Sequence, residues 1–185
     1  MILPVYLYGQ PILRKVANNI MLDYPGFESL IINMFETLTN ADGIGLAATQ
    51  IGLSDRILVL DLSPLSDKDP SFKGLKKVMV NPIILSKEGE EAEIEEGCLS
   101  LPGLHELVSR KDSIRIQYLD ENFQPHDVIY TGFLSRVIQH EYDHLEGVLF
   151  VDHISGIRKQ LIKSKLNKLV KGITSCSYKT RAVGK

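Results

Sequence analysis

Length, composition and charge describe an ordinary globular chain: it has 185 residues, of which 44% are hydrophobic and 24% charged, and a formal net charge of −2. No window approaches the roughly 18 uncharged apolar residues of a membrane span, and the amino end lacks a basic start followed by a long apolar run. We therefore expect an untargeted cytoplasmic protein with a single domain over residues 1–185, in which about 155–185 form a C-terminal helix and a basic tail.

The small net charge conceals an asymmetry along the chain. All 23 acidic residues precede residue 153, whereas nine of the 21 basic residues lie from Arg158 onward. The part from Arg158 thus carries +9 and the rest of the chain carries −11. Cys98 and Cys176 are the only cysteines, too few for a disulfide framework.

The first predicted element is an amphipathic helix that begins near Phe27. Its apolar residues recur at intervals of three and four: Phe27, Leu30, Ile31, Met34, Phe35 and Leu38. Asp42-Gly43 ends this helix. The apolar run 57–62 predicts a buried strand, and 63–77, with two prolines and a glycine, is typical of a surface loop.

The middle of the chain predicts an antiparallel sheet. Short segments, several of them alternating, are separated by Gly, Pro, Asp or Asn, and they cover 78–85, 93–96, 104–110, 113–119 and 126–130. Helical spacing returns from Phe133 to Leu145, with Gly147 as a stop, and a basic helix is expected from about Ser155 to Val170. We expect an α+β fold with antiparallel β-sheets around a central HExxH helix, an amphipathic N-terminal helix and a basic C-terminal helix.

The strongest chemical signal is the pentad His140-Glu141-Tyr142-Asp143-His144. Residues four apart lie on one face of a helix, so both imidazoles can bind one metal ion. Glu141 lies beside them, where it can take a proton from metal-bound water. A surface helix that happens to contain two histidines and acids is the alternative, and the apolar flanks of the pentad argue against it.

Two histidines do not hold a catalytic metal, so the third ligand decides the class of enzyme. The third histidine of the metzincin proteases would fall at Phe150, and the downstream glutamate of gluzincin-type proteases is missing because no glutamate follows Glu146. Cys98, in the stretch Glu-Gly-Cys-Leu-Ser, is the strongest remaining candidate, and Gly97 permits close backbone approach to a metal. An isolated cysteine is otherwise a small buried hydrophobe.

A third notable stretch, 43–50, reads Gly-Ile-Gly-Leu-Ala-Ala-Thr-Gln. Its small residues let a ligand backbone come close, and the Gln50 amide could donate a hydrogen bond to a carbonyl oxygen. The stretch lacks the third glycine of a dinucleotide fingerprint, so we expect no nucleotide cofactor. By itself it could be a helix C-cap followed by a turn.

Together these stretches resemble the peptide deformylase family, whose pattern is Gly-x-Gly-x-Ala-Ala-x-Gln, then Glu-Gly-Cys-Leu-Ser, then Gln-His-Glu-x-Asp-His. All three are complete in this sequence. Pro11, Leu13 and Arg14 also look like the opening segment of that family, and the likeness runs to about residue 155. The resemblance implies a hydrolase that removes the formyl group from the N-formylmethionine of nascent polypeptides and releases formate.

The resemblance also implies a role for each matching residue. The metal ligands would be Cys98, His140 and His144. Glu141 would be the acid/base, and Gln50 and the backbone N–H of Leu99 would bind the formyl oxygen. Three protein ligands in a tetrahedral site leave one position for water, whose pKa a metal can lower to about 7.

The identity of the metal does not follow from the ligands, because iron, zinc, nickel and cobalt all accept a thiolate and two imidazoles. One divalent ion per chain is expected, and Fe²⁺ is favoured because the resembled family commonly uses it. Two other functions stay open: a metalloprotease that needs no formyl group, and a metal-stabilised, ribosome-associated binding module without catalysis. The intact Glu141 and Gln50 argue against the binding module.

Members of the resembled family hold the substrate peptide as an added strand and place its methionine side chain in an apolar pocket beside the metal. The substrate-binding candidates here are Gly43, Ile44, Gly45, Ile94, Gly97, Phe133 and Val137. Ordinary core packing is the alternative for the four apolar ones. Many relatives carry an arginine near position 105, where this chain has His105.

The remaining polar residues near the motifs allow two interpretations. Glu96 and Asp143 would either orient the histidines or neighbouring backbone, as metal ligands commonly require, or be solvated at the surface. His105, His126 and His153 have no matching partner pattern in the sequence. We expect these three histidines to be surface or structural residues.

The expected C-terminal helix carries a cationic series: Arg158, Lys159, Lys163, Lys165, Lys168 and Lys171. A solvated cationic face is one interpretation. The other is docking onto ribosomal RNA near the exit of the nascent chain, which resemblance to bacterial members with a long terminal helix implies. No membrane partner is expected.

Overall fold

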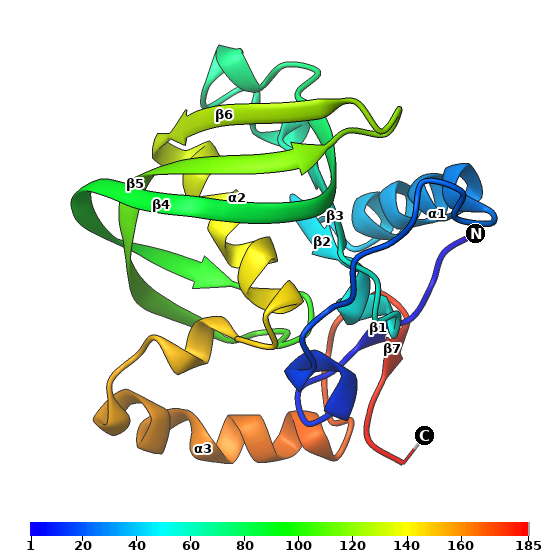
Figure 1. Cartoon of the computed structure of the whole chain (residues 1–185). Helices are drawn as coiled ribbons and strands as arrows, with labels where there is room; N and C mark the ends of the chain where they lie inside the picture. The colour runs from blue at the N-terminus through cyan, green and yellow to red at the C-terminus, as the bar shows by residue number, and fades with distance from the viewer. Residues whose placement is uncertain (185) are drawn as a thin grey trace.

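The main sheet has five strands in the order β2-β3-β4-β5-β6, and every neighbouring pair is antiparallel. The computed structural model describes residues 1–184. The strands are β2 Gly45–Ala47, β3 Ile57–Asp61, β4 Lys76–Gly97, β5 His105–Leu119 and β6 Pro125–Thr131. Figure 1 shows β4 and β5 curving around the helix α2, Gly132–Leu145. The α+β class and the antiparallel sheet are as predicted.

Four of the predicted strands together form only two long strands, so their prediction as separate segments was wrong. The segments 78–85 and 93–96 both belong to β4, and 104–110 and 113–119 both belong to β5. The pairing of β4 with β5 continues through register shifts at three places, Val80/Ile83, Ile84/Ser86 and Glu88/Glu91. Such bulges bend a strand without ending it, which accommodates the proline and glycine that suggested breaks.

Two further helices pack against other parts of the protein. The helix α1, Phe27–Asn40, packs its buried Met34 and Leu38 with apolar residues of β2 and β3. The helix α3, Gly156–Val170, begins where the Ser155 side chain accepts a hydrogen bond from the N–H of Arg158 at 3.3 Å. Its inward residues, Ile162, Leu166 and Leu169, join the apolar cluster that contains Phe150.

The segments around β3 differ in detail from their prediction. The glycine-rich stretch forms β2 and a 3₁₀ turn, Ala48–Ile51, and β3 is buried at all five residues. The predicted loop 63–77 contains two short 3₁₀ turns, Ser63–Leu65 and Pro70–Phe72, before β4 begins. None of the helices within residues 1–184 is long and apolar enough to cross a membrane.

The two ends of the chain meet in a second, two-stranded sheet. Strand β7, Thr180–Arg181, pairs in parallel with β1, Val5–Tyr6. Figure 1 shows the segment after α3 returning alongside the N-terminal segment. The C-terminal part of the chain is thereby brought back toward the end of β4.

Asn81 provides a test of how the N-terminal segment is held to the sheet. Its side chain accepts a hydrogen bond from the Ile20 N–H and donates one to the Ile20 carbonyl, both at 2.9 Å, and its φ is 50°. Alanine removes both bonds and tolerates this left-handed backbone poorly. We expect Asn81→Ala to lower the free energy of unfolding by about 2–3 kcal/mol in urea denaturation. Asn122→Ala, at an exposed position, is the control, and equal losses in both variants would contradict this assignment.

Candidate active site

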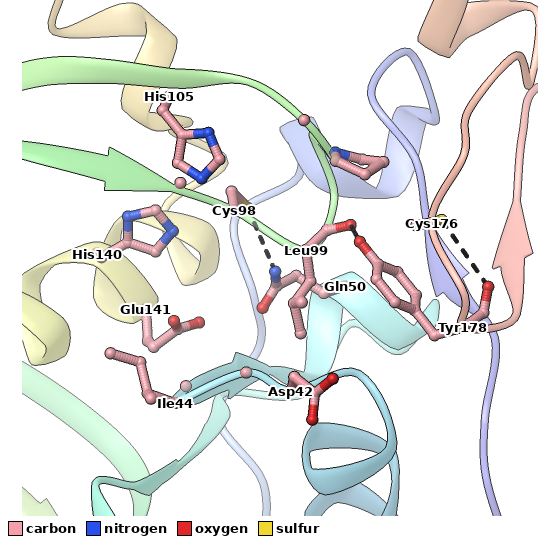
Figure 2. Close-up of a pocket in the computed structure, with 15 residues that line it drawn as sticks. Asp42, Ile44, Gln50, Cys98, Leu99, His105, His140, Glu141, Cys176 and Tyr178 are labelled. Carbon is pink, nitrogen blue, oxygen red and sulfur yellow. Dashed lines mark hydrogen bonds between the residues drawn. The ribbon is translucent and has the colours of Figure 1, made fainter. Parts of the chain in front are cut away.

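A cleft of about 450 Å³ lies where β2, the end of β4 and α2 meet. Figure 2 shows residues from these distant parts of the chain around it. The lining includes Asp42, Gly43, Ile44, Gly45, Gln50, Gly97, Cys98, Leu99, His105, His140, Glu141, Cys176 and Tyr178. The three motifs separated along the sequence therefore converge on one cavity.

Cys98, His140 and His144 form a cluster with the geometry of a metal site. Their potential ligand atoms all lie within 4.8 Å of one another, and the Cys98 Sγ is 3.1 Å from the His144 Nε2. The two imidazole rings meet edge to face, with centroids 5.2 Å apart. Helical spacing explains why the two histidines share a face, whereas the end of β4 delivers the cysteine.

The charges of the cluster favour the thiolate form of Cys98. Burial would raise the pKa of the Cys98 thiol, but the imidazoles of His144 and His140 lower it to about 5. The thiol is thus readily converted to the thiolate, the form that binds metals. Burial lowers the pKa of His140, but its hydrogen bonds with Cys98 and Glu96 raise it well above the usual value.

Glu141 lies beside this cluster and is 4% exposed. Its Oε2 is buried without a hydrogen-bond partner, as is the His144 Nδ1, and such atoms are rare in folded proteins. Burial is the main cause that raises the pKa of Glu141 to about 7. A free carboxylate oxygen beside a thiolate and two imidazoles fits a divalent cation with a water molecule, and a nearby cation would lower this pKa.

Glycine at position 45 allows the close approach of β2 to α2. A Cβ atom placed on Gly45 would lie 2.7 Å from the Cδ of Glu141, so any side chain there would displace the carboxylate. At Gly97, a Cβ would lie 2.7 Å from the His105 ring. Both glycines therefore leave room for side chains that line the cleft.

Gln50 is held with its amino group toward the cluster. Its Oε1 accepts a hydrogen bond from the Ala47 N–H at 2.8 Å. Its Nε2 donates toward the Cys98 Sγ at 3.5 Å and the Ser100 Oγ at 3.4 Å. The amide orientation is thus set by the backbone, and the donor end faces the candidate metal site.

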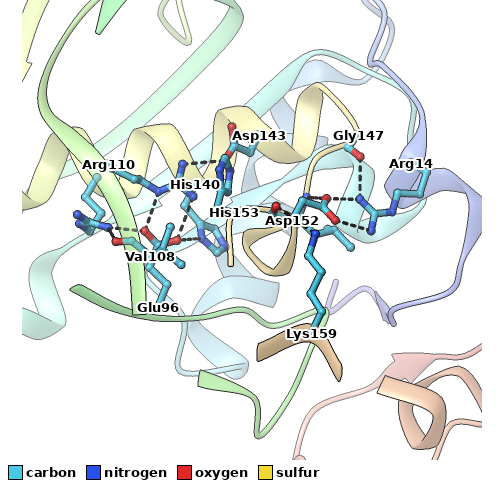
Figure 3. A network of polar contacts seen from close by, with 12 residues as sticks. Arg14, Glu96, Val108, Arg110, His140, Asp143, Gly147, Asp152, His153 and Lys159 are labelled. Atoms are coloured by element: carbon cyan, nitrogen blue, oxygen red, sulfur yellow. Dashed lines mark hydrogen bonds and ion pairs between the residues drawn. The ribbon is translucent and has the colours of Figure 1, made fainter. Parts of the chain in front are cut away.

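Glu96 connects the cluster to a buried network of charges (Figure 3). Its Oε2 lies 2.9 Å from the His140 Nδ1, which leaves the Nε2 of that ring free to face a metal. Arg110 donates to both carboxylate oxygens of Glu96, at 2.7 and 3.0 Å, and Arg136 donates to one of them at 2.7 Å. Burial raises the pKa of Glu96, but the His140 and Arg110 contacts outweigh it and hold the pKa well below the ordinary value.

Asp143 extends the network along α2, three residues after His140. It accepts a hydrogen bond from Arg110 at 2.7 Å and lies 2.8 Å from the His153 Nε2. Glu96 is 7% exposed and Asp143 is 6% exposed, so surface solvation is the wrong interpretation for both. Glu96 orients a histidine of the cluster, and Asp143 fixes the arginine that holds Glu96.

The predicted substrate-binding residues are distributed over two cavities. A second cavity, of about 110 Å³, adjoins the cleft and is lined on its apolar side by Ile44, Phe133 and Val137. Ile94 lies on the same face of β4 as Glu96, but two residues nearer the hairpin, where it is 39% exposed and lines neither cavity. The advance of about 3.3 Å per strand residue carries it away from the cluster.

Several residues of the site had no signal in the sequence. Arg110 and Arg136 are buried partners of Glu96, but an arginine in a strand or a helix is normally exposed. Cys176 and Tyr178 reach the cleft from the C-terminal segment, which follows no motif. His105 lines the cleft too, so its description as merely surface or structural was incomplete, whereas His126 pairs with Asp120 at 2.9 Å as a structural residue would.

The fold and the cluster together define an α+β protein with a Cys-His-His candidate metal centre. Residues 2–160 match the family model described as Polypeptide deformylase. The chain is 47% identical to the peptide deformylase of Flavobacterium psychrophilum, over 100% of this chain and 99% of that protein, and 47% identical to that of Christiangramia forsetii, over 98% and 96%.

Solved structures agree with these sequence comparisons. The crystal structure of a peptide deformylase from Legionella pneumophila superposes with a TM-score of 0.80 at 37% identity, over 92% of this chain and 96% of that one. That from Thermus thermophilus gives 0.81 at 36% identity, over 94% and 100%. The chain belongs to the peptide deformylase family. It is a hydrolase of protein biosynthesis that removes the formyl group from nascent peptides, and the family depends on a metal.

Replacement of Glu96 tests the network behind the metal ligands. Glu96→Gln keeps the shape of the side chain but removes the negative charge that faces Arg110, Arg136 and His140. We expect metal affinity to fall by about 10- to 100-fold, measured by metal titration of the purified apoprotein.

The matched control is Glu93→Gln, an exposed glutamate on the same strand. It should bind metal as the wild type does. Wild-type affinity in Glu96→Gln would show that the carboxylate charge does not support the ligands.

Proposed function

We propose that Cys98, His140 and His144 hold one divalent metal and that Glu141 is the acid/base of deformylation. The supporting observation is the cluster itself: a thiol 3.1 Å from an imidazole nitrogen, with an unpartnered buried carboxylate oxygen beside it. A thiolate and two imidazoles suit iron, zinc, nickel or cobalt, and we propose Fe²⁺ as the physiological ion because the family commonly uses it. When bound, the metal would act as a Lewis acid and lower the pKa of a water molecule to provide the nucleophile.

With the metal bound, residues of this chain would transfer the proton and stabilise the developing negative charge. Glu141 accepts the proton of the attacking water and delivers it to the amine nitrogen that leaves, which returns the carboxylate to its starting state. Burial favours the protonated form between these two transfers. The Gln50 amide and the Leu99 N–H donate hydrogen bonds to the formyl oxygen as it becomes negative, and one such donor is typically worth about 3–4 kcal/mol of barrier.

Substrate binding would use both cavities. We assign the methionine side chain to the small cavity lined by Ile44, Phe133 and Val137, which opens beside His140 and Glu141. The peptide backbone would lie along Gly43–Gly45 and Gly97 in the cleft, where the absence of side chains permits close approach. The exposed position of Ile94 supports at most a peripheral contact.

The test of this function is formate release from N-formyl-Met-Ala-Ser by protein purified without oxygen. Unformylated Met-Ala-Ser is the control for peptide-bond cleavage, and metal content is read on the same sample. Metal-dependent formate release is expected, with no cleavage of the control peptide. Cleavage of the control would favour a metalloprotease, and a folded, metal-loaded sample without release would favour a binding module.

Two substitutions separate metal binding from proton transfer. Glu141→Ala should keep the metal, because this residue is not a proposed ligand, and should lower kcat by about 10²- to 10⁴-fold. Cys98→Ala should lose both metal and turnover. Both are followed by metal analysis and formate release, with Glu121→Ala in an exposed turn as the control.

Full activity in Glu141→Ala would remove its proposed role as acid/base. Full metal content in Cys98→Ala would remove the thiolate from the ligand set. Loss of metal in Glu141→Ala would instead make that carboxylate a ligand.

We further propose that this chain is a single catalytic domain and that the enzyme is cytoplasmic. The exposed face of α3 supports the proposal that it docks on ribosomal RNA. Lys163, Lys165 and Lys168 are exposed on this helix. Ile162, Leu166 and Leu169 are buried against the rest of the protein, whereas Ile157 and Leu161 are exposed. The positive charge of the C-terminal part complements a phosphate backbone. A solvated cationic face is the alternative.

Charge reversal on α3 distinguishes these two interpretations. The triple variant Lys163→Glu, Lys165→Glu, Lys168→Glu should lower ribosome affinity by at least about tenfold at low salt, because it replaces attraction to phosphates by repulsion. Deletion of the helix is unsuitable, since it would also remove buried Ile162 and Leu166 from the core. Co-sedimentation with ribosomes is the measurement.

The matched control reverses three exposed lysines elsewhere, Lys68, Lys73 and Lys87. Both triple variants should release formate from the small peptide at the wild-type rate. Equal binding of the two variants to ribosomes would refute docking through α3.

A further inference from the structure

The segment that follows α3 turns back and forms one wall of the cleft. It is anchored at β7 by two backbone hydrogen bonds, from the Val5 N–H to the Lys179 carbonyl and from the Leu7 N–H to the Arg181 carbonyl, both 2.9 Å. The Gln10 amide also donates to the Ala182 carbonyl at 2.6 Å, and Ala182 is buried. This segment lies beyond residues 2–160, the part that matches the family model.

Tyr178 projects from this anchored segment toward Leu99 (Figure 2). Its hydroxyl donates a hydrogen bond to the Leu99 carbonyl at 2.7 Å, and its ring lines the cleft together with Cys176. Burial is the main cause that raises the pKa of Tyr178 above its usual value. The phenol is therefore neutral at physiological pH and keeps the proton that it donates.

The hydrogen bond from Tyr178 is one of three that restrain the short turn at residues 98–100. The Cys98 carbonyl accepts from the Leu101 N–H at 2.9 Å, and the Ser100 carbonyl accepts from the Tyr8 N–H at 2.9 Å. Between them, the Leu99 carbonyl accepts from the Tyr178 hydroxyl. Three consecutive carbonyls are thus held by three different parts of the chain, and only the middle one depends on a side chain.

The orientation of the Leu99 N–H depends on these neighbouring peptide groups. The N–H shares a peptide group with the Cys98 carbonyl, and the next peptide group carries the Leu99 carbonyl. When both carbonyls are held, the φ and ψ torsions of Leu99 cannot change freely. Loss of the Tyr178 contact would release one of the two restraints.

We propose that Tyr178 is a positioning residue for deformylation, whose hydroxyl holds the Leu99 carbonyl and so keeps the Leu99 N–H aimed at the formyl oxygen. This inference rests on the role proposed above for the Leu99 N–H. The C-terminal segment has its own anchors at Lys179, Arg181 and Ala182, so it stays in place when the hydroxyl is removed. A change confined to the hydroxyl therefore acts on the turn at Leu99 and leaves the fold intact.

The experiment is Tyr178→Phe, measured as formate release with substrate varied and turnover expressed per bound metal. Removal of an oxyanion donor costs about 10²- to 10³-fold in kcat, and a donor that is only less well aimed should cost less, about tenfold. KM should change less than about twofold, because the contact acts on the developing charge rather than on the bound peptide. Metal content and melting temperature should stay near the wild-type values.

The control is Tyr6→Phe. Tyr6 also uses its hydroxyl to contact the C-terminal segment, accepting a hydrogen bond from Arg181 at 3.0 Å, but it does not line the cleft. Its kcat should equal that of the wild type. A fall in kcat of similar size in both variants would assign the effect to the segment as a whole and would overturn the role of Tyr178.

Two other outcomes would also overturn the proposal: an unchanged kcat in Tyr178→Phe, or a fall that disappears when turnover is expressed per bound metal. The wild type and Glu141→Ala are measured in the same experiment. They distinguish failure of this proposal from failure of the proposed function. If the wild type releases formate, Glu141→Ala does not, and Tyr178→Phe is fully active, then only the role of Tyr178 fails. If the wild type releases none, the proposed function itself fails.

Discussion

Burial of the Glu96 carboxylate between two arginines and His140 is the interaction on which the geometry of the site depends. An unpaired buried charge is very costly, so Glu96 must be met by Arg110, Arg136 and the imidazole at once. These partners come from β5 and α2, while Glu96 itself stands near the end of β4. Pairing them fixes the helix against the sheet, two residues before the cysteine of the cluster.

The same network of paired charges extends along α2 from His140 to Asp143. Arg110 reaches from Glu96 to Asp143, and Asp143 contacts His153 beyond the end of α2. Every charge in this chain of contacts is paired, which is the condition under which a buried polar network stabilises a unique arrangement. Glu141 has no such partner on its buried Oε2, and this residue lines the cleft. Burial is the main cause of the raised pKa of Glu141.

The ends of the chain contribute to the site through the small parallel sheet. Strand β7 lies against β1, and the N-terminal segment and the C-terminal segment each hold one carbonyl of the turn after Cys98. In chain order, α3 follows α2 and precedes this C-terminal segment. The helix therefore leads the chain back toward the cleft, and this structural role is separate from any binding of a partner by its positive charge.

Local spacing in the sequence was sufficient to predict that His140 and His144 lie together. Two histidines four apart share a face because helical geometry is fixed, and the alternation of short apolar segments was sufficient for an antiparallel sheet. The sequence did not show that Pro82 and Gly89 lie within one continuous strand, because bulges in the β4–β5 pairing depend on both strands. It also left open whether Glu96 and Asp143 were solvated.

What the sequence by itself determined was the class of fold and a set of candidate residues: His140, Glu141 and His144 follow from helical spacing, and Cys98 from the need for a third ligand and the resemblance to a family motif. Tertiary structure alone decided which arginines meet Glu96, that Ile94 lies outside both cavities, and that Tyr178 reaches Leu99. These contacts join residues 14, 40 and 79 positions apart, and strand register and the path of the returning segment set them. No periodicity within a short window contains that information, because the partners become neighbours only when the sheet closes around α2.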